Sequence, residues 1–172
     1  MPTWADENHT AIILDNGAKV PADEKNRDYR KLVASGAIVE YAAPAVTSAD
    51  IDQEWTRRVF TEFPFNGETF HADRDSVDNI LGSVSWAQDA IANNVQAGNY
   101  YWQADDPDNP GQGDLPFAWK SKSNGLIPMD APTVVAFGKA AAKWKQDHFI
   151  AARALKAMDP IPSDYKDDSY WP

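Results

Sequence analysis

The sequence predicts an α+β fold, in which a small N-terminal β-hairpin–helix–strand unit precedes an antiparallel two-helix hairpin with short β-hairpins. Asn-Gly pairs at 16–17 and 66–67 lie between β-rich runs, as is typical of two-residue hairpin turns. Two later segments carry apolar residues at three- and four-residue steps, the spacing of one helix face. We therefore expect three parts: the N-terminal unit over 1–46, a helical-hairpin module over 47–159, and an extended C-terminal tail over 160–172.

The N-terminal unit is predicted from turn and cap residues. Pro21 should end the second strand because it has no N–H to donate. Asp23 is expected to cap a short helix, and Gly36 stands where a helix commonly ends. The expected elements are a strand over 10–14, a return strand over 18–20, a helix over 25–34 and a strand over 37–41.

The second module is predicted to centre on two long helices. Asp73 and Asp130 are expected to cap them, and their alanine-rich faces should allow close antiparallel packing. Residues 99–116 form a loop, and one this long is usually functional or mobile. The expected elements are helices over 47–59, 73–94 and 130–158 and hairpins around Asn66-Gly67 and Ser123-Asn124-Gly125.

Composition disfavours several classes of partner. A net charge of −10 would repel nucleic acid and anionic lipid, although an acidic face could meet a basic partner. The absence of cysteine excludes disulfides and thiolate metal sites. The polar, acidic first residues do not resemble a signal peptide, and no apolar run approaches the roughly 20 residues needed to cross a bilayer. We expect a soluble protein with no membrane or nucleic-acid partner.

No residues in the sequence form a recognisable catalytic motif. The three histidines are far apart, and Asp73 beside His71 is better explained as a helix cap. His148 lies on the apolar stripe of the longest helix and is expected in the core or an interface. There is no Gly-x-Ser-x-Gly elbow or phosphate-binding Gly-rich loop, and nothing singles out one pair among 26 acids. We expect no catalytic residue, no metal, no cofactor and no enzyme activity.

The acidic loop contains the closest approach to a metal site. Asp106-x-Asp108 followed by Gly111 resembles the start of a calcium loop. Pro110 occupies the fifth ligand position, however, and Phe117 stands where the bidentate Glu should be. A solvated turn is the favoured interpretation.

Aromatic residues are the main candidates for function. The chain has seven Trp, seven Phe and six Tyr, and Trp and Tyr are favoured at protein–protein contacts. The aromatics that flank the 99–116 loop could contact a partner, pin the loop to the helices or stack on sugar, the first two being favoured. If the chain forms homo-oligomers, the edge of the long helix with Phe137, Trp144 and Phe149 is the expected contact. The candidate partner-binding residues are Tyr29, Tyr41, Tyr100, Tyr101, Trp102, Phe117, Trp119, Trp144, Tyr170 and Trp171.

Two stretches resemble phage tail proteins. The first resembles a run common near the start of tail-fibre and tail-fibre-assembly proteins, and comprises Val20-Pro21-Ala22-Asp23, Asn26-Arg27-Asp28-Tyr29 and Gly36. The second resembles a phage-tail family catalogued as domain of unknown function 4376. It comprises Phe63, Phe65, Gly67, Phe70, Asp73, Ser76, Ile80, Trp119, Asn124, Met129-Asp130, Ala152, Leu155 and Lys156. The 98–116 loop is longer than that family usually has.

The resemblance implies a structural component of a bacteriophage tail, at a baseplate or fibre-attachment position. Its partners would be other tail proteins, fibre or baseplate subunits, and it would be made in the host cytoplasm and reside in the virion. The family has no established catalytic residues, so none are carried over. A tail-fibre assembly chaperone is the alternative, and a carbohydrate-binding or lytic module is a third class.

Overall fold

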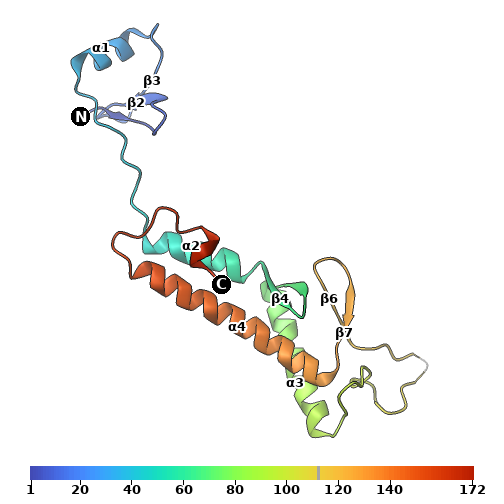
Figure 1. The fold of residues 1–172 in the computed structure, drawn as a ribbon. Coiled ribbons are helices and arrows are strands. Elements are labelled where there is room, and N and C mark those ends of the chain that lie inside the picture. Colours follow the sequence, from blue (N-terminus) through green and yellow to red (C-terminus); the bar gives the residue numbers. More distant parts are fainter. Residues whose placement is uncertain (112) are drawn as a thin grey trace. The chain divides into compact units, whose positions relative to one another are not determined.

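The computed structural model describes residues 1–111 and 113–172 and forms two compact units, Met1–Ala45 and Val46–Pro172 (Figure 1). The predicted α+β class is confirmed, since both units combine helices with small antiparallel sheets. The first unit contains β1 (Thr3–Trp4), β2 (Ala11–Ile13), β3 (Lys19–Pro21) and α1 (Arg27–Ser35). The second contains α2 (Ser48–Val59), β4 (Glu62–Phe65), β5 (Glu68–His71), α3 (Arg74–Ala92), β6 (Ala118–Lys120), β7 (Leu126–Pro128), α4 (Ala131–Lys156) and the 3-10 helix η1 (Asp168–Tyr170).

The first unit has a three-stranded antiparallel sheet in the order β1-β2-β3. Ile12 pairs with Val20 across the predicted hairpin, and both are buried. Trp4 stacks on His9 with ring centroids 4.3 Å apart and lies 6.3 Å from the ring of Tyr29 on α1. Trp4 thus links the sheet to α1 through an aromatic contact.

The cap of α1 differs from the prediction. The helix begins at Arg27, and Asn26 rather than Asp23 is its cap, accepting the backbone N–H groups of Asp28 and Tyr29. Asp23 instead accepts the N–H of Lys25 in the preceding turn. Asp and Asn are both suited to capping a helix and to closing a turn. From sequence alone, Asp23 and Asn26 are therefore equally good candidates for the start of α1.

The strand predicted over 37–41 is wrong. Only Val39 pairs, through an isolated parallel bridge to Thr3. The partner strand β1 has two residues, too few for an alternating pattern, and it was missed. Because β1 is so short, the 37–41 segment cannot form a continuous series of backbone hydrogen bonds with it.

In the second unit, α2 and α3 lie one after the other along α4 (Figure 1). The 26 residues of α4 give it a length of about 39 Å. Ile51 of α2 packs with Leu155 near the end of α4, whereas the N–H of Gly98, after α3, donates to the Asp130 carboxylate at the start of α4. The predicted antiparallel pairing of α3 and α4 is therefore confirmed, and α2 is a third helix on the same scaffold.

The predicted caps of α3 and α4 are confirmed, and α2 also begins with a cap. Thr47 and Asp50 form a reciprocal capping box at α2. Asp73 accepts the backbone N–H of Ser76 at α3, and this hydrogen bond holds the pKa of Asp73 below its usual value. Helix capping thus accounts for the Asp73 carboxylate beside His71. Asp130 performs the same role at α4.

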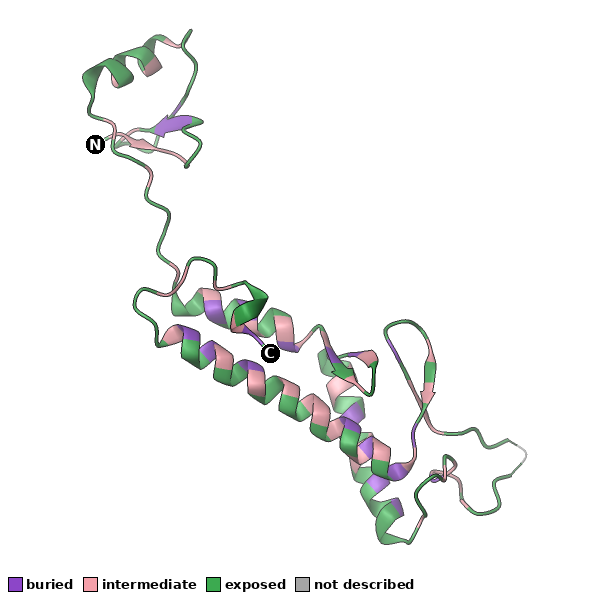
Figure 2. Cartoon of the chain, viewed as in Figure 1, coloured by how far each residue is buried: buried purple, intermediate pink, exposed green. Residues whose placement is uncertain are grey.

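One core cluster joins the β4–β5 hairpin to α3 and the first half of α4 (Figure 2). Asn66 and Gly67 both have positive φ, as the predicted two-residue turn requires. The turn brings Phe63 and Phe70 to Phe137, with ring centroids 5.0 and 4.8 Å from it. All three phenylalanines are fully buried.

A second core cluster lies at the other end of α4, and it corrects the extended tail predicted over 160–172. The tail folds back and ends in η1, and Trp171 is buried with Ile51, Ala152 and Leu155. The indole N–H of Trp171 donates to the backbone oxygen of Tyr165 at 2.8 Å. Three prolines and three aspartates are consistent with an extended tail, but burial of one large indole folds it back.

Residues 99–116 have no helix or strand among those that the structure describes, and Gln112 lies outside them. The predicted hairpin after the loop is confirmed by β6 and β7, with Asn124 at positive φ. Within the described ranges, no helix is long and apolar enough to cross a membrane.

Candidate interaction surfaces

Two of the ten predicted contact residues are buried within the fold. Trp171 lies in the second core cluster, and Trp102 is 2% exposed. The indole N–H of Trp102 donates to the backbone oxygen of Met129 at 3.0 Å, and its ring meets those of Trp86 and Phe117. Both residues are corrected to core positions, and for Trp102 the structure matches the loop-pinning interpretation.

The other eight keep some accessible surface but do not form one site. Tyr29 and Tyr41 belong to the first unit, where Tyr29 packs on Trp4. In the second unit, Tyr100 is 42% exposed, whereas the others are half-buried. Trp119 packs against Phe137 and so also supports the core. The half-buried residues of the second unit are Tyr101, Phe117, Trp119, Trp144 and Tyr170.

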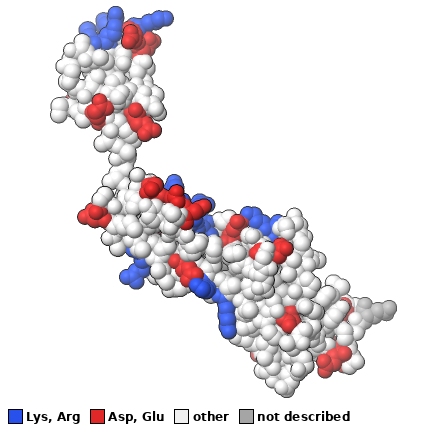
Figure 3. Space-filling view, viewed as in Figure 1, with Lys and Arg blue, Asp and Glu red and all other residues white. Residues whose placement is uncertain are grey.

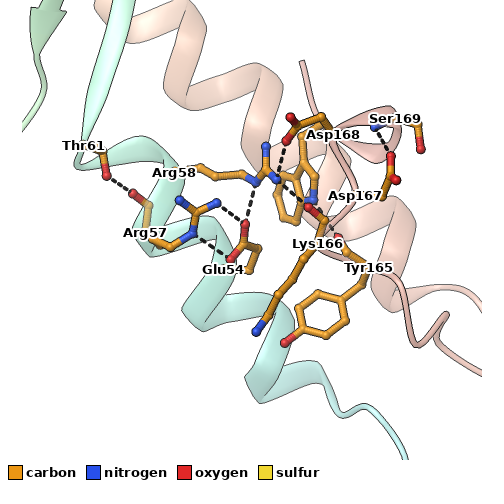
Figure 4. A network of polar contacts seen from close by, with 10 residues as sticks. Glu54, Arg57, Arg58, Thr61, Tyr165, Lys166, Asp167, Asp168 and Ser169 are labelled. Atoms are coloured by element: carbon orange, nitrogen blue, oxygen red, sulfur yellow. Dashed lines mark hydrogen bonds and ion pairs between the residues drawn. The ribbon is translucent and has the colours of Figure 1, made fainter.

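An ion-pair network holds the C-terminal tail against α2 (Figure 4). Glu54 is 4% exposed and accepts hydrogen bonds from Arg57 at 2.6 and 2.9 Å and from Arg58 at 2.7 Å. Arg58 reaches on to the Asp168 carboxylate at 2.8 Å and lies over the ring of Trp171. One guanidinium therefore ties the helix to the tail by charge and by stacking.

The Glu54 network makes a prediction about pH. Hydrogen bonding from Arg57, followed by Arg58, holds the pKa of Glu54 below its usual value. Its contribution to stability is present above the unfolded-state pKa of about 4.3 and is lost as pH falls through the lower folded-state pKa. Glu54→Gln should lower the free energy of unfolding by about 1 kcal/mol at pH 7, because Gln keeps an acceptor but loses the charge.

Urea unfolding at several pH values measures this effect. The difference between wild type and Glu54→Gln should shrink as pH falls below about 4. Asp52→Asn is the matched control, since Asp52 pairs with Lys156 at an exposed position on the same helix. A difference that stays constant down to pH 2 would contradict the role given to the Glu54 charge.

The second unit also has an apolar groove that the sequence did not predict. A cavity of about 170 Å³ opens where the end of α2, the start of α3 and the middle of α4 meet. A shallower hollow adjoins it, bordered by Trp55 and Phe149, and shares Ala142 and Lys145 with it. We call the two together the α4 groove. Its first part is lined chiefly by Phe60, Val77, Leu81, Gly138, Ala142 and Trp144.

Two cations lie over the Phe60 ring beside the α4 groove. The Lys145 ammonium lies 4.8 Å and the Arg74 guanidinium 5.9 Å from the centre of the Phe60 ring. Neither forms an ion pair with the described residues. Lys145 lines the groove itself, whereas Arg74 lies with Asp78 in an adjoining hollow that shares Phe60 and Lys145 with the groove. On the face seen in Figure 3, acidic side chains are scattered over both units rather than gathered in one patch.

The groove could have been found from the helical periodicity. Val77, Ile80 and Leu81 belong to one apolar run of α3, but a run of this kind is usually assigned wholly to the core. Leu81 is 62% exposed at the groove rim. The sequence alone does not show that the small residues Gly138 and Ala142 of α4 lie opposite and leave part of the space unfilled.

His148 lies in the core, one of its two predicted positions. It is 1% exposed, its Nδ1 lies 2.9 Å from the backbone oxygen of Trp144, and burial lowers its pKa. In the acidic loop, the Asp106 carboxylate accepts the N–H groups of Asp108 and Asn109 and thus closes a turn. Over residues 1–111 and 113–172, no three His, Asp or Glu side chains gather in a group that could hold a metal ion.

The fold defines an α+β protein whose larger unit is organised on one long helix. Residues 42–169, about three quarters of the chain, match the family model described as Domain of unknown function (DUF4376). The chain belongs to this family. No curated protein and no solved structure matches it. The matched segment covers most of the second unit and leaves nearly all of the first outside.

Proposed function

We propose that this protein is a structural component of a bacteriophage tail, at a baseplate or fibre-attachment position, and that it acts through protein–protein contacts. The observation that carries the proposal is the family match over residues 42–169, taken together with the resemblance of the same region to phage tail proteins. The tail-fibre-like run over 20–36 lies in the other unit and adds separate support. The partners would be fibre or baseplate subunits, and the location would be the virion.

Physical features of the described residues are compatible with a role in assembly. The first unit buries only Ala11, Ile12 and Val20 among its hydrophobic residues, while Ile13, Val33 and Val39 are exposed. A unit of this size with so small a core gains stability when a partner covers its exposed apolar side chains. The second unit offers the α4 groove.

Mass spectrometry of purified virions of the phage that encodes the chain tests the proposal. We expect peptides from both units at a stoichiometry fixed relative to the major tail proteins. Virions that lack the chain would contradict a structural role.

A tail-fibre assembly chaperone is the second candidate. The accessible α4 groove favours it, since a chaperone needs an apolar surface that a folding client can occupy and leave. Co-expression of the fibre with and without the chain distinguishes the two roles. A chaperone should raise the yield of assembled fibre and be absent from finished particles.

The carbohydrate-binding alternative has lost one of its predicted residues. Trp102 is buried beneath the loop, so its ring face is not available to a sugar. Tyr100 and Tyr101 keep accessible surface, but no exposed tryptophan lies beside them in the described part of the loop.

A further inference from the structure

We propose that the α4 groove binds an acidic amphipathic helix of a partner protein, about two turns long. This inference deepens the proposed function by naming the binding surface and the chemistry of the partner. It rests on the proposed function, in which the protein acts through protein–protein contacts. It is carried by the shape of the groove, its apolar lining and the two cations beside it.

The floor of the groove is a single stripe of α4. Ala142, Lys145 and Phe149 follow one another at steps of three and four residues, so they lie on one helix face. From Ala142 to Phe149 this stripe extends about 10 Å, the length of roughly two helical turns. A helix lying along it would match that length.

The floor is open at the exposed Ala142, whose small side chain allows another backbone to approach α4 closely, while larger side chains stand on either side. At Gly138, Val84 of α3 already occupies the space beside the backbone. Trp55 of α2 borders one end and Leu81 of α3 borders the other. An amphipathic helix placed in such a groove buries its apolar face between the two walls.

The deeper part of the groove has room for one large apolar side chain. Its volume of about 170 Å³ exceeds the roughly 150 Å³ of an apolar cavity that accepts benzene. Phe60, Val77 and Leu81 around it provide an apolar environment. A Leu or Phe anchor on the partner helix would fit this space.

The charge beside the groove favours acidic residues next to the apolar anchor of the partner helix. Lys145 and Arg74 both lie over the Phe60 ring with no ion pair within the described chain, although the protein carries a net charge of −10. Asp78 offsets part of this charge. Carboxylates beside the apolar anchor would meet both cations, whereas lysines there would be repelled. A second copy of this acidic chain is less suited than a partner with a locally acidic helix.

A pair of synthetic peptides tests the proposal on the full-length protein. The first is a fluorescein-labelled helical peptide with Leu at i, i+3, i+4 and i+7 and Glu at its other positions, and the second replaces every Glu with Lys. Fluorescence anisotropy should show saturable binding of the glutamate peptide at least about ten times tighter than that of the lysine peptide. Added salt should narrow the difference.

Two variants of α4 locate the binding surface. Ala142→Glu places a carboxylate on the groove floor at an exposed position and should weaken binding of the glutamate peptide at least about tenfold. Ala136→Glu is the matched control, since Ala136 is exposed on the same helix but outside the groove, and it should leave binding unchanged. Lys145→Glu should shift the preference toward the lysine peptide.

Three results would overturn the proposal: no saturable binding of the glutamate peptide, equal binding of both peptides, or an unchanged affinity in Ala142→Glu. Light scattering, which measures the oligomeric state, tests whether a second copy of the chain occupies the groove instead. A dimer that Ala142→Glu dissociates would assign the groove to a second copy and overturn the proposed partner. Groove binding by a chain that is absent from virions would leave this inference standing and contradict the virion role alone.

Discussion

Phe137→Ala is expected to lower the free energy of unfolding of the second unit by about 3–5 kcal/mol, the largest single-residue effect that we predict. Phe137 is fully buried, and its ring lies 4.8–5.3 Å from those of four other aromatic residues. Truncation removes this apolar contact and leaves a cavity between α4 and two hairpins. The four neighbours are Phe63, Phe65, Phe70 and Trp119.

Urea unfolding monitored by circular dichroism measures the loss. Phe149→Ala is the matched control, because Phe149 is 45% exposed on the same helix and should change stability by only about 0.5 kcal/mol. Equal losses in the two variants would show that Phe137 is not at the centre of the core.

Gly138→Ala is expected to lower stability by about 2 kcal/mol through overpacking. A Cβ at this position would lie 2.4 Å from Cγ2 of Val84 on α3. Valine is stiff at χ1 in a helix, so Val84 cannot easily turn away, and the two helices must separate instead. Alanine normally favours a helix over glycine, so the predicted sign is opposite to that of helix propensity.

Gly82→Ala provides the opposite expectation on the neighbouring helix. Its added Cβ would meet nothing within 4 Å, and stability should rise by about 0.5–1 kcal/mol. Combining Gly138→Ala with Val84→Ala should recover part of the loss if Val84 is the obstacle, as a double-mutant cycle of unfolding free energies would show. A stabilising Gly138→Ala would contradict the close approach of α3 and α4.

The elements that the sequence predicted well have strong local determinants. Asn66-Gly67 requires positive φ at two adjacent residues, and few structures other than a tight hairpin use that. Asp73 and Asp130 each precede a long apolar period, so cap and periodicity support the same helix start. Local chemistry and tertiary packing agree in these cases.

The errors lie where tertiary packing decides. Val39 pairs with a strand too short to be recognised. Trp171 is buried against α4 and against Ile51 of α2, which lies more than a hundred residues earlier in the chain. The α4 groove escaped prediction for the same reason. Apolar periodicity shows that Leu81 faces something, but only the packed helices show that Gly138 and Ala142 leave the space in front of it open.

The two ends of the long loop after α3 are held together independently of its length. The N–H of Phe117 donates to the backbone oxygen of Tyr100 at 2.7 Å, and the N–H of Gly98 donates to Asp130. For a flexible loop with fixed ends, doubling the number of residues costs only about 0.6 kcal/mol of closure entropy. Insertions and deletions between Asp105 and Asp114, which leave the buried Trp102 in place, should therefore be nearly neutral for the fold. Relatives can diverge in this segment while the helices and hairpins around it keep the same packing.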